Sequence, residues 1–519
     1  MALSDIGYGS LLLALVTASW GLLLALVSRG QPFSAPAVSA RRGLYACAVS
    51  LALASGILLY SFLTDNFRLE YVVAYSSRDL PVMYKVAAFN AGNAGSLLYI
   101  ALALALLGSL AVALMRRRHP SLLPDVVAAV LTTELFFLTV MVFLANPFAK
   151  LPFAALNGRG LNPLLEHPAM AIHPPLMMAG FIGLTVPFAF AMAALASGRL
   201  GNEWLDSMRR WTIVPWAILG LANLLGGWWA YAELGWGGYW GWDPVENAGA
   251  MPWLVTTALL HSMVIQKRRG LLKLWNLVLV LLAYHLALFG IFLDRSGVLS
   301  SVHTFADSGI GKLFLGYVIG SFVASTALLA WRLRSLRDDS TMESVVSREG
   351  AFLLNNVALL GVVAIVFVGT IYPWIAEAAW GVKLAPGPGF FNRATGPVLL
   401  ALLVLMGVGP VVPWREAHLK AILRPLAVPL SGAILLVVLL LVVGMRQAWA
   451  LAGFGACALV TGTIVWELAR GSRARARSRG DGYSRSRVVR EMVRHYGDLY
   501  FRKEESGGRT GTRGAALPV

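Results

Sequence analysis

The sequence predicts an all-α, polytopic membrane protein with about thirteen transmembrane helices. Only 13% of its 519 residues are charged and 58% are hydrophobic, whereas an ordinary soluble domain carries about 25% charged residues. Apolar runs recur with lengths near the roughly 20 residues that a helix needs to cross a bilayer, for example 10–28 and 428–444. Ten-residue segments of alternating hydrophobicity are absent, so a transmembrane β-barrel is not expected.

The apolar runs define the predicted helices and one membrane domain over 1–469. The first run has no basic leader and no small-residue cleavage site, so we expect a retained helix rather than a signal peptide. The thirteen predicted helices lie near 9–28, 43–63, 94–115, 122–145, 174–197, 211–229, 249–266, 273–293, 311–334, 350–373, 395–413, 426–444 and 448–469.

Basic clusters predict the orientation of these helices. The net charge is +17, and the clusters fall in alternate connections, which places those connections in the cytoplasm by the positive-inside rule. The N-terminus is then extracytoplasmic and the C-terminus cytoplasmic, in a cell inner (cytoplasmic) membrane. Residues 470–519 hold 13 arginines and lysines against 5 acidic residues, and we expect a basic, disordered cytoplasmic tail.

A tryptophan-rich stretch, GGWWAYAELGWGGYWGWDPVENA at 226–248, lies on the opposite, extracytoplasmic face. Tryptophans clustered with glycines predict an aromatic platform close to the backbone, suited to a flat apolar ligand. The platform residues are Trp228, Trp229, Trp236, Trp240, Trp242, Asp243, Pro244, Glu246 and Asn247. Asp243 and Glu246 also precede an apolar run, so they are expected to cap the helix that begins there.

Two histidines on the same face are candidate iron ligands. His173 is predicted to begin the helix at 174–197, with two prolines behind it, and His303 lies in the loop after the helix at 273–293. Two imidazoles beside an aromatic platform could bind the iron of a porphyrin. Arg295 could pair with a porphyrin propionate, because guanidinium binds carboxylate in bidentate fashion, or with Asp294 or lipid headgroups instead.

Two further histidines lie inside predicted membrane helices. His261 sits about eleven residues, and so roughly 16 Å, below the outer surface, where an ionisable residue suggests a function. His285 is placed similarly, but a histidine that hydrogen-bonds to a neighbouring helix accounts for it better. The remaining histidines are interpreted as loop or tail residues, and Cys47 and Cys457 as small core residues.

The tryptophan stretch resembles the WWD signature of heme-handling proteins, and other segments of the chain resemble the CcmF family of cytochrome c maturation proteins within that group. The resemblance covers about residues 70–415. The supporting segments include LPVMYKVAAFNAGNAGSLLYI, FLANPFAKL, LNPLLEHPAMAIHPPLMMAGFIG, RSGVLSSVHTFA, SREGAFLLNN, GTIYPWIAEAAWGVKLAPGPGFFN and MGVGPVVPWREA.

The resemblance implies holocytochrome c synthase-type (heme lyase) activity within a complex. Heme delivered by the chaperone CcmE would meet apocytochrome c, presented by CcmH- or CcmI-type partners, and its vinyl groups would form thioethers with a CxxCH motif. The tryptophan stretch would hold this heme, with His173 and His303 near its iron. His261 would be one ligand of an internal heme b that reduces the incoming heme, with quinol as electron donor.

Two positions depart from the family pattern. Asn93 stands where the family commonly has histidine, so that position receives no role. The family's second internal-heme histidine is expected on a later helix that follows an RRYG-like stretch. VRHYGDLYFRKEES resembles that stretch, but Arg502 stands at the position expected for histidine and no apolar helix follows. We expect a truncated chain or a second polypeptide that supplies the missing C-terminal helices; His285 as a substitute ligand and loss of the internal heme are the alternatives.

Two competing functions remain open from the sequence. CcsA-type heme exporters and synthases share the arrangement of histidines around a WWD segment, although the flanking segments here fit CcmF better. A proton-coupled transporter could use Glu134, His261 and His285 as a relay. That function predicts repeated, interrupted helices, which the sequence lacks, and it leaves the tryptophans unexplained.

Overall fold

The regular structure of the chain is helical. The computed structural model describes residues 3–116, 119–299, 301, 303, 309–336, 338, 340–382, 384–415 and 418–478. Within these ranges, one isolated antiparallel bridge between Leu69 and Lys150 is the sole departure from helices, turns and loops. The all-α fold class predicted from the sequence is therefore confirmed.

Thirteen spans in the described residues are long and apolar enough to cross a membrane, as predicted. α7 and α8 together form one of these spans, and α3 (Glu70–Tyr75) and α4 (Val82–Ala88) are short helices outside them. The long helices are α1 (Leu3–Val27), α2 (Ala35–Leu63), α5 (Asn93–Met115), α6 (Leu123–Phe143), α7 (Pro168–Gly183), α8 (Thr185–Ser197), α9 (Glu203–Glu233), α10 (Pro244–Arg269), α11 (Lys273–Ser296), α12 (Gly311–Arg332), α13 (Arg348–Trp380), α14 (Pro388–Val408), α15 (Leu419–Val442) and α16 (Ala448–Ser478).

Several helices extend beyond their predicted ends. α9 begins at Glu203 rather than near 211, because its first turns are polar and a hydropathy pattern detects only the apolar part of a helix. α7 begins at Pro168 rather than near 174. His167 caps α7, since its Nδ1 accepts a hydrogen bond from Ala169 N at 3.2 Å, so His173 lies inside the helix and not at its start.

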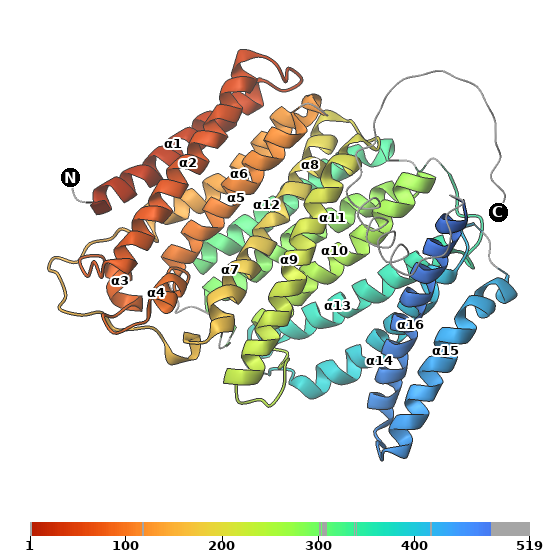
Figure 1. Ribbon diagram of the computed structural model, residues 1–519. Coiled ribbons are helices and arrows are strands. Elements are labelled where there is room, and N and C mark those ends of the chain that lie inside the picture. The colour runs from red at the N-terminus through yellow and green to blue at the C-terminus, as the bar shows by residue number, and fades with distance from the viewer. Residues whose placement is uncertain are drawn as a thin grey trace. The chain divides into compact units, whose positions relative to one another are not determined.

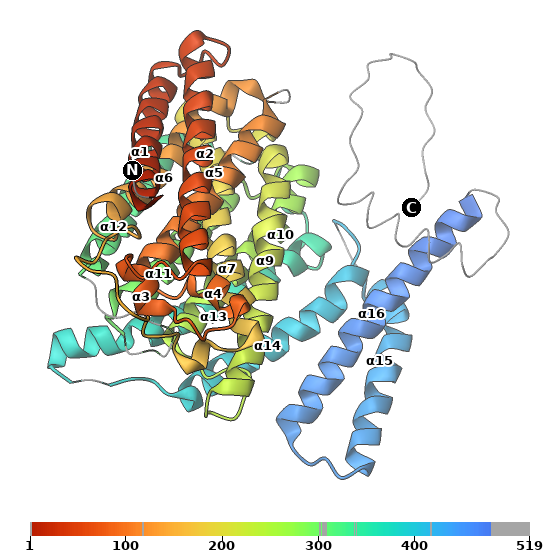
Figure 2. The same ribbon diagram turned by 60° about the vertical axis from the view of Figure 1, so that its left-hand side comes forward.

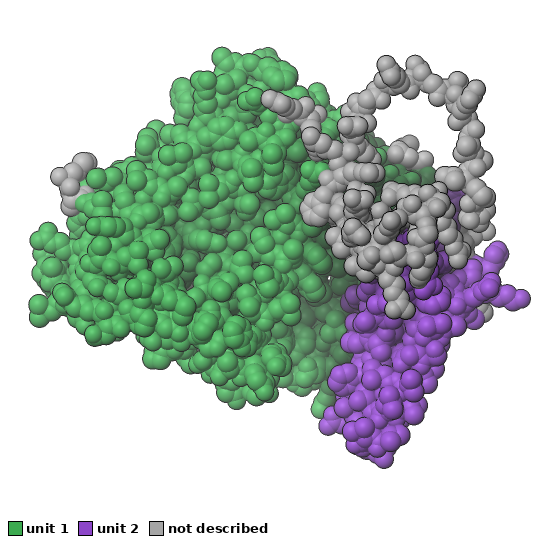
Figure 3. Space-filling model, in the orientation of Figure 1, with its two compact units in different colours: residues 1–343, 352–399 green, residues 344–351, 400–519 purple. Residues whose placement is uncertain are grey.

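The chain divides into two compact units, coloured separately in Figure 3. Unit 1 comprises residues 1–343 and 352–399, and unit 2 comprises 344–351 and 400–519. In unit 1 the long helices run alongside one another, with α3 and α4 at one end (Figures 1 and 2). α1 packs on α2 and α6, α7 on α9, and α10 on α11.

One end of unit 1 carries the long connections, and we call it the site end. Because successive long helices alternate in direction, the connections 64–92, 144–167, 234–243 and 297–310 all emerge there. Two of them are tied together: besides the bridge from Leu69 to Lys150, Arg159 N donates to Val73 O at 2.7 Å. These ties brace the connections around the cavity described below.

Unit 2 contains the hairpin of α15 and α16, whose packing includes Val411, Leu426, Ala433 and Leu459. α16 continues to Ser478, so the first residues of the predicted tail are helical rather than disordered; residues 479–519, with His495 and Arg502, lie outside the described residues. Cys47 in unit 1 is buried, as expected of a core residue, whereas Cys457 on α16 is exposed.

Candidate functional site

Two histidines that are 130 positions apart line one cavity at the site end. The cavity holds about 410 Å³, within the range of small-molecule and cofactor sites. α7 supplies His173, α9 supplies Trp229, and the connection after α11 supplies His303. The remaining lining residues are Ala74, Tyr75, Ala87, Asn90, Ala91, Ser96, Gly160, Leu161, Asn162, Leu165, Met170, Pro174, Met177, Met178, Val245 and Asp294.

A backbone carbonyl on α9 fixes the ring of His173. His173 Nδ1 lies 2.8 Å from Ala222 O. Because a carbonyl oxygen can only accept, Nδ1 carries the proton of the neutral ring and Nε2 keeps its lone pair. Gly226 makes room for this ring, since a Cβ there would lie 2.5 Å from His173 Cε1.

A carboxylate fixes the ring of His303. His303 Nδ1 lies 3.0 Å from Asp243 Oδ1. Ser301 Oγ donates to the same oxygen at 2.7 Å and accepts from His303 N at 3.0 Å. The carboxylate therefore holds the proton on Nδ1 and leaves Nε2 free, as is typical of metal-binding histidines. Both imidazoles of the cavity are thus prepared as Nε2 ligands.

Asp243 is ionised in this arrangement. Burial by itself would raise the pKa of Asp243, but the hydrogen bonds from His303, Ser301 and Val245 N outweigh it. The net effect holds the pKa of Asp243 below its ordinary value. An ionised Asp243 accepts the hydrogen bond from His303 Nδ1 more strongly than a protonated carboxyl group would.

Asp243 also begins α10, as the sequence predicted. Val245 N donates to Asp243 Oδ1 at 2.9 Å, while Asp243 N and Gly241 N donate to Glu246 Oε2 at 3.1 and 2.9 Å. This reciprocal arrangement is a capping box, so the predicted capping roles of Asp243 and Glu246 are confirmed. Asp243 consequently joins the start of α10 to the ring of His303.

The predicted tryptophan platform is divided between two places. Trp229 is buried in the wall of the cavity, its ring centroid 5.2 Å from that of His303, and its Nε1 donates to Leu164 O at 2.9 Å. Trp228 and Trp236 are exposed, and Trp228 packs edge-on against His167 at 5.2 Å. Helical periodicity separates adjacent residues such as Trp228 and Trp229 onto different sides of α9, so one continuous platform does not form.

Trp242 faces a second, smaller cavity of about 270 Å³. Its ring stacks on Phe391 at 5.1 Å, and its Nε1 donates to Asn392 Oδ1 at 2.8 Å. Trp240 packs edge-on against Trp242 at 6.0 Å. Pro244 and Asn247 also line this second cavity, and Asn247 Nδ2 donates to Trp242 O and Thr370 Oγ1 at 3.1 and 3.0 Å.

Arg295 lies behind the first cavity. It is fully buried, and it donates to Asp294 Oδ2 at 3.0 Å and Ser96 Oγ at 2.9 Å. Asp294 and Ser96 line the cavity, whereas Arg295 is not among the lining residues. Of the partners considered from the sequence, the structure shows Asp294.

The two intramembrane histidines do not line this cavity, and they have different neighbours. Asn355 Nδ2 lies 3.3 Å from His261 Nδ1, and the ring of Phe352 lies 5.2 Å from the His261 ring. His285 Nδ1 bonds Leu281 O in its own helix at 2.7 Å, and its ring packs edge-on against Phe322 of α12 at 5.3 Å. Across the described residues, no hydrogen bond or ion pair joins His261, His285 and Glu134 into a relay.

Several cavity residues were missed from the sequence. Met177 and Met178 follow His173 on α7, and Tyr75 comes from the connection that carries α3. Burial raises the pKa of Tyr75, which keeps its hydroxyl neutral. The pair Gly226-Gly227 before the tryptophans was a usable signal, because paired glycines in a helix indicate close approach of another element.

Comparisons with known proteins agree with this architecture. A family model described as cytochrome C assembly protein matches residues 91–299. The cytochrome c-type biogenesis protein ccl1 of Rhodobacter capsulatus is 39% identical over 461 residues, which cover 87% of this chain and 70% of that protein. The CcmF proteins of Pseudomonas aeruginosa and Escherichia coli are each 39% identical, over 83% and 84% of this chain and 66% and 68% of their own lengths.

A solved structure, the cytochrome c heme lyase CcmF, shares the fold. Its TM-score is 0.75 at 31% identity, over 96% of this chain and 75% of that one. The sequence identity, the covered lengths and the thirteen apolar helices all agree: the chain belongs to the CcmF family of cytochrome c biogenesis proteins.

Proposed function

We propose that the chain handles heme and takes part in its covalent attachment to the CxxCH motif of apocytochrome c. The observation that carries this proposal is the pair His173 and His303, whose Nδ1 atoms are each held by an acceptor while both rings line one cavity. Two preset Nε2 atoms are suited to axial ligation of a heme iron. Trp229 supplies an apolar aromatic wall beside them.

Thioether formation depends more on how the heme and the cysteine thiols are positioned than on acid or base groups of the protein. In each thioether, the cysteine sulfur bonds to the inner carbon of a heme vinyl group and the thiol hydrogen is transferred to the terminal vinyl carbon, with no net oxidation. Holding heme and thiols in one orientation is a large contribution to the rate. The cavity residues would bind and orient the heme substrate in that step.

The proposed partners are CcmE for heme delivery, CcmH- or CcmI-type proteins for presentation, and apocytochrome c as substrate. Family membership supports these assignments. The proposed location is the inner membrane with the site end extracytoplasmic. The basic residues at the opposite end of unit 1, such as Arg116, Lys267 and Arg332, support this orientation.

An internal heme b, reduced by quinol, is proposed at His261. Asn355 and Phe352 surround the His261 ring, and no second imidazole contacts it in the described ranges. The described residues therefore supply one ligand of a bis-histidine site. Loss of a b-type spectrum from purified protein on His261→Ala substitution would support the site.

The outer cavity can be tested with His173→Ala and His303→Ala, using His119→Ala as control because His119 lies at the opposite end of unit 1. We expect both variants to lose covalent heme attachment to a co-expressed apocytochrome c and to bind added heme more weakly by absorbance titration. His119→Ala should behave as the unmodified protein. Unchanged attachment in both cavity variants would contradict the assignment.

A further inference from the structure

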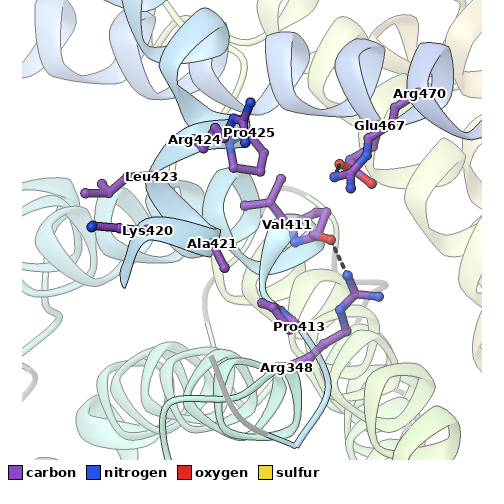
Figure 4. A pocket seen from close by; sticks show the side chains of 11 residues that line it. Arg348, Val411, Pro413, Lys420, Ala421, Leu423, Arg424, Pro425, Glu467 and Arg470 are labelled. Atoms are coloured by element: carbon purple, nitrogen blue, oxygen red, sulfur yellow. Dashed lines mark hydrogen bonds and ion pairs between the residues drawn. The ribbon is translucent and has the colours of Figure 1, made fainter. Parts of the chain in front are cut away.

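Unit 2 contains a basic groove that the proposed function does not use. Its volume is about 1020 Å³, and the start of α15, the segment 410–413 and the end of α16 form its walls (Figure 4). The groove carries four cationic side chains against one carboxylate. The lining residues are Arg348, Pro410, Val411, Pro413, Lys420, Ala421, Leu423, Arg424, Pro425, Glu467 and Arg470.

One of the four cations is part of the wall. Arg348 Nε donates to Val412 O at 2.8 Å, its terminal nitrogen donates to Pro410 O, and its guanidinium lies 5.3 Å from the Trp414 ring centroid. These contacts fix Arg348 in place. Its guanidinium nonetheless lines the groove.

The other cations are exposed to the groove. Lys420 and Arg424 lie four residues apart on α15, so they share one helix face. No ion pair joins either side chain to an acidic residue within the described part of unit 2, so the two like charges repel each other. Arg470 lies 3.7 Å from Glu467, both on α16. An anion between α15 and α16 would relieve this repulsion.

The backbone at the start of α15 favours an anion at the same place. α15 begins at Leu419, and His418 provides no side-chain cap. The first N–H groups of a helix lack intrahelical acceptors and carry the positive end of the helix dipole. Lys420 and Arg424 thus stand beside a helix end that attracts phosphate.

The remaining surface of α15 indicates that this anion carries apolar chains. Leu423 is 52% exposed inside the groove, and Val428 and Leu430 are 57% and 44% exposed further along the helix. The segment Lys420–Val442 is one of the membrane spans. A basic headgroup site therefore opens directly onto a lipid-facing apolar surface, as in basic pockets that bind anionic lipids.

We propose that unit 2 binds an anionic phospholipid. Its phosphate lies between Lys420, Arg424 and Arg470 at the start of α15, and its acyl chains follow the exposed apolar side of α15. Free inorganic phosphate would fill only the polar half of the groove.

The test compares lipid binding to the full chain in detergent, measured by native mass spectrometry with phosphatidylglycerol and, separately, phosphatidylcholine. The variants are Lys420→Ala/Arg424→Ala and, as a control, Arg446→Ala, which removes an arginine at the other end of the same hairpin. Each basic residue near an anionic lipid contributes about fivefold, so we expect phosphatidylglycerol affinity to fall about 25-fold in the double variant. Arg446→Ala should bind as the unmodified protein does.

Three results would overturn the proposal: equal phosphatidylglycerol binding by the double variant and the unmodified protein, equal binding of the two lipids, or displacement of phosphatidylglycerol by millimolar inorganic phosphate. The double variant must keep the melting temperature of the unmodified protein in lipid-free detergent. If it does not, phosphatidylglycerol binding is compared between the single variants Arg424→Lys and Arg424→Ala. Lysine keeps the positive charge, so Arg424→Lys should retain phosphatidylglycerol binding and Arg424→Ala should weaken it.

Discussion

Asp243 Oδ1 accepts hydrogen bonds from both Val245 N at the start of α10 and His303 Nδ1, at 2.9 and 3.0 Å. One carboxylate therefore begins a helix and orients a candidate iron ligand. These two roles differ in what they require, because a helix cap needs only an oxygen acceptor, whereas orienting a metal-binding imidazole depends on the charge of the carboxylate.

Replacing Asp243 with asparagine should separate the two roles. Asparagine caps helices about as well as aspartate, so Asp243→Asn should change the melting temperature little. Loss of the charged partner of His303 should weaken heme binding by about 10- to 100-fold, measured by absorbance titration. Glu246→Gln is the matched control, since it alters the other half of the capping box and should leave heme binding intact.

Stability near Asp243 should depend on pH with a defined sign. Because the folded state holds the pKa of Asp243 below its ordinary value of 3.8, the ionised carboxylate contributes stability above that pH. The contribution is lost as the pH falls below 3.8 and through the lower folded value. The difference in melting temperature between the unmodified protein and Asp243→Ala should thus be constant from pH 7 to 5 and shrink towards pH 3. A difference that grows on acidification would contradict this interpretation.

Gly226→Ala should displace the His173 ring. The added Cβ would lie 2.5 Å from His173 Cε1, a contact that requires the ring or α9 to move, at a cost of about 1–3 kcal/mol. We expect heme attachment to fall more than the amount of folded protein. Gly56→Ala on α2 is the control, because a Cβ there meets nothing within 4 Å, and it should leave attachment unchanged.

Substitution of Arg295 can distinguish a structural role for this side chain from direct binding of a heme propionate. Its side chain is fully buried and pairs with Asp294, and breaking a buried ion pair costs about 3–5 kcal/mol. Arg295→Ala should lower the melting temperature and reduce attachment in proportion to the folded protein that remains. Attachment that falls while the melting temperature is unchanged would instead support direct contact with a heme propionate.

The sequence predicted the helices well and the site only in part. Apolar runs as long as α5 and α11 can cross a membrane stably only as helices, because a helix satisfies its own backbone hydrogen bonds. Hydropathy alone was therefore enough to locate them. Asp243 and Glu246 were identifiable as caps because the capping box is local in sequence. The bond from Asp243 to His303 was not identifiable, since it joins residues 60 positions apart through the arrangement of α10 and α11. Likewise, the tryptophans form one group in the sequence, but α9 ends within that group. Trp229 lies on α9 and lines the first cavity, whereas Trp242 lies beyond the end of α9 and lines the second.

Glu134 on α6 provides a test between heme handling and the alternative of a proton relay. Its side chain is fully buried, and neither carboxyl oxygen has a hydrogen-bond partner among the described residues. An isolated carboxylate at such a position would be costly, so the isosteric and neutral Glu134→Gln should keep or raise the melting temperature. Because no hydrogen bond connects Glu134 with His261 or His285 in the described residues, we expect heme attachment in the glutamine variant to match the unmodified protein. If the glutamine variant folds but loses heme attachment, the carboxyl group of Glu134 is needed for the reaction. That result would favour the proton relay, in which Glu134 gives and takes up a proton.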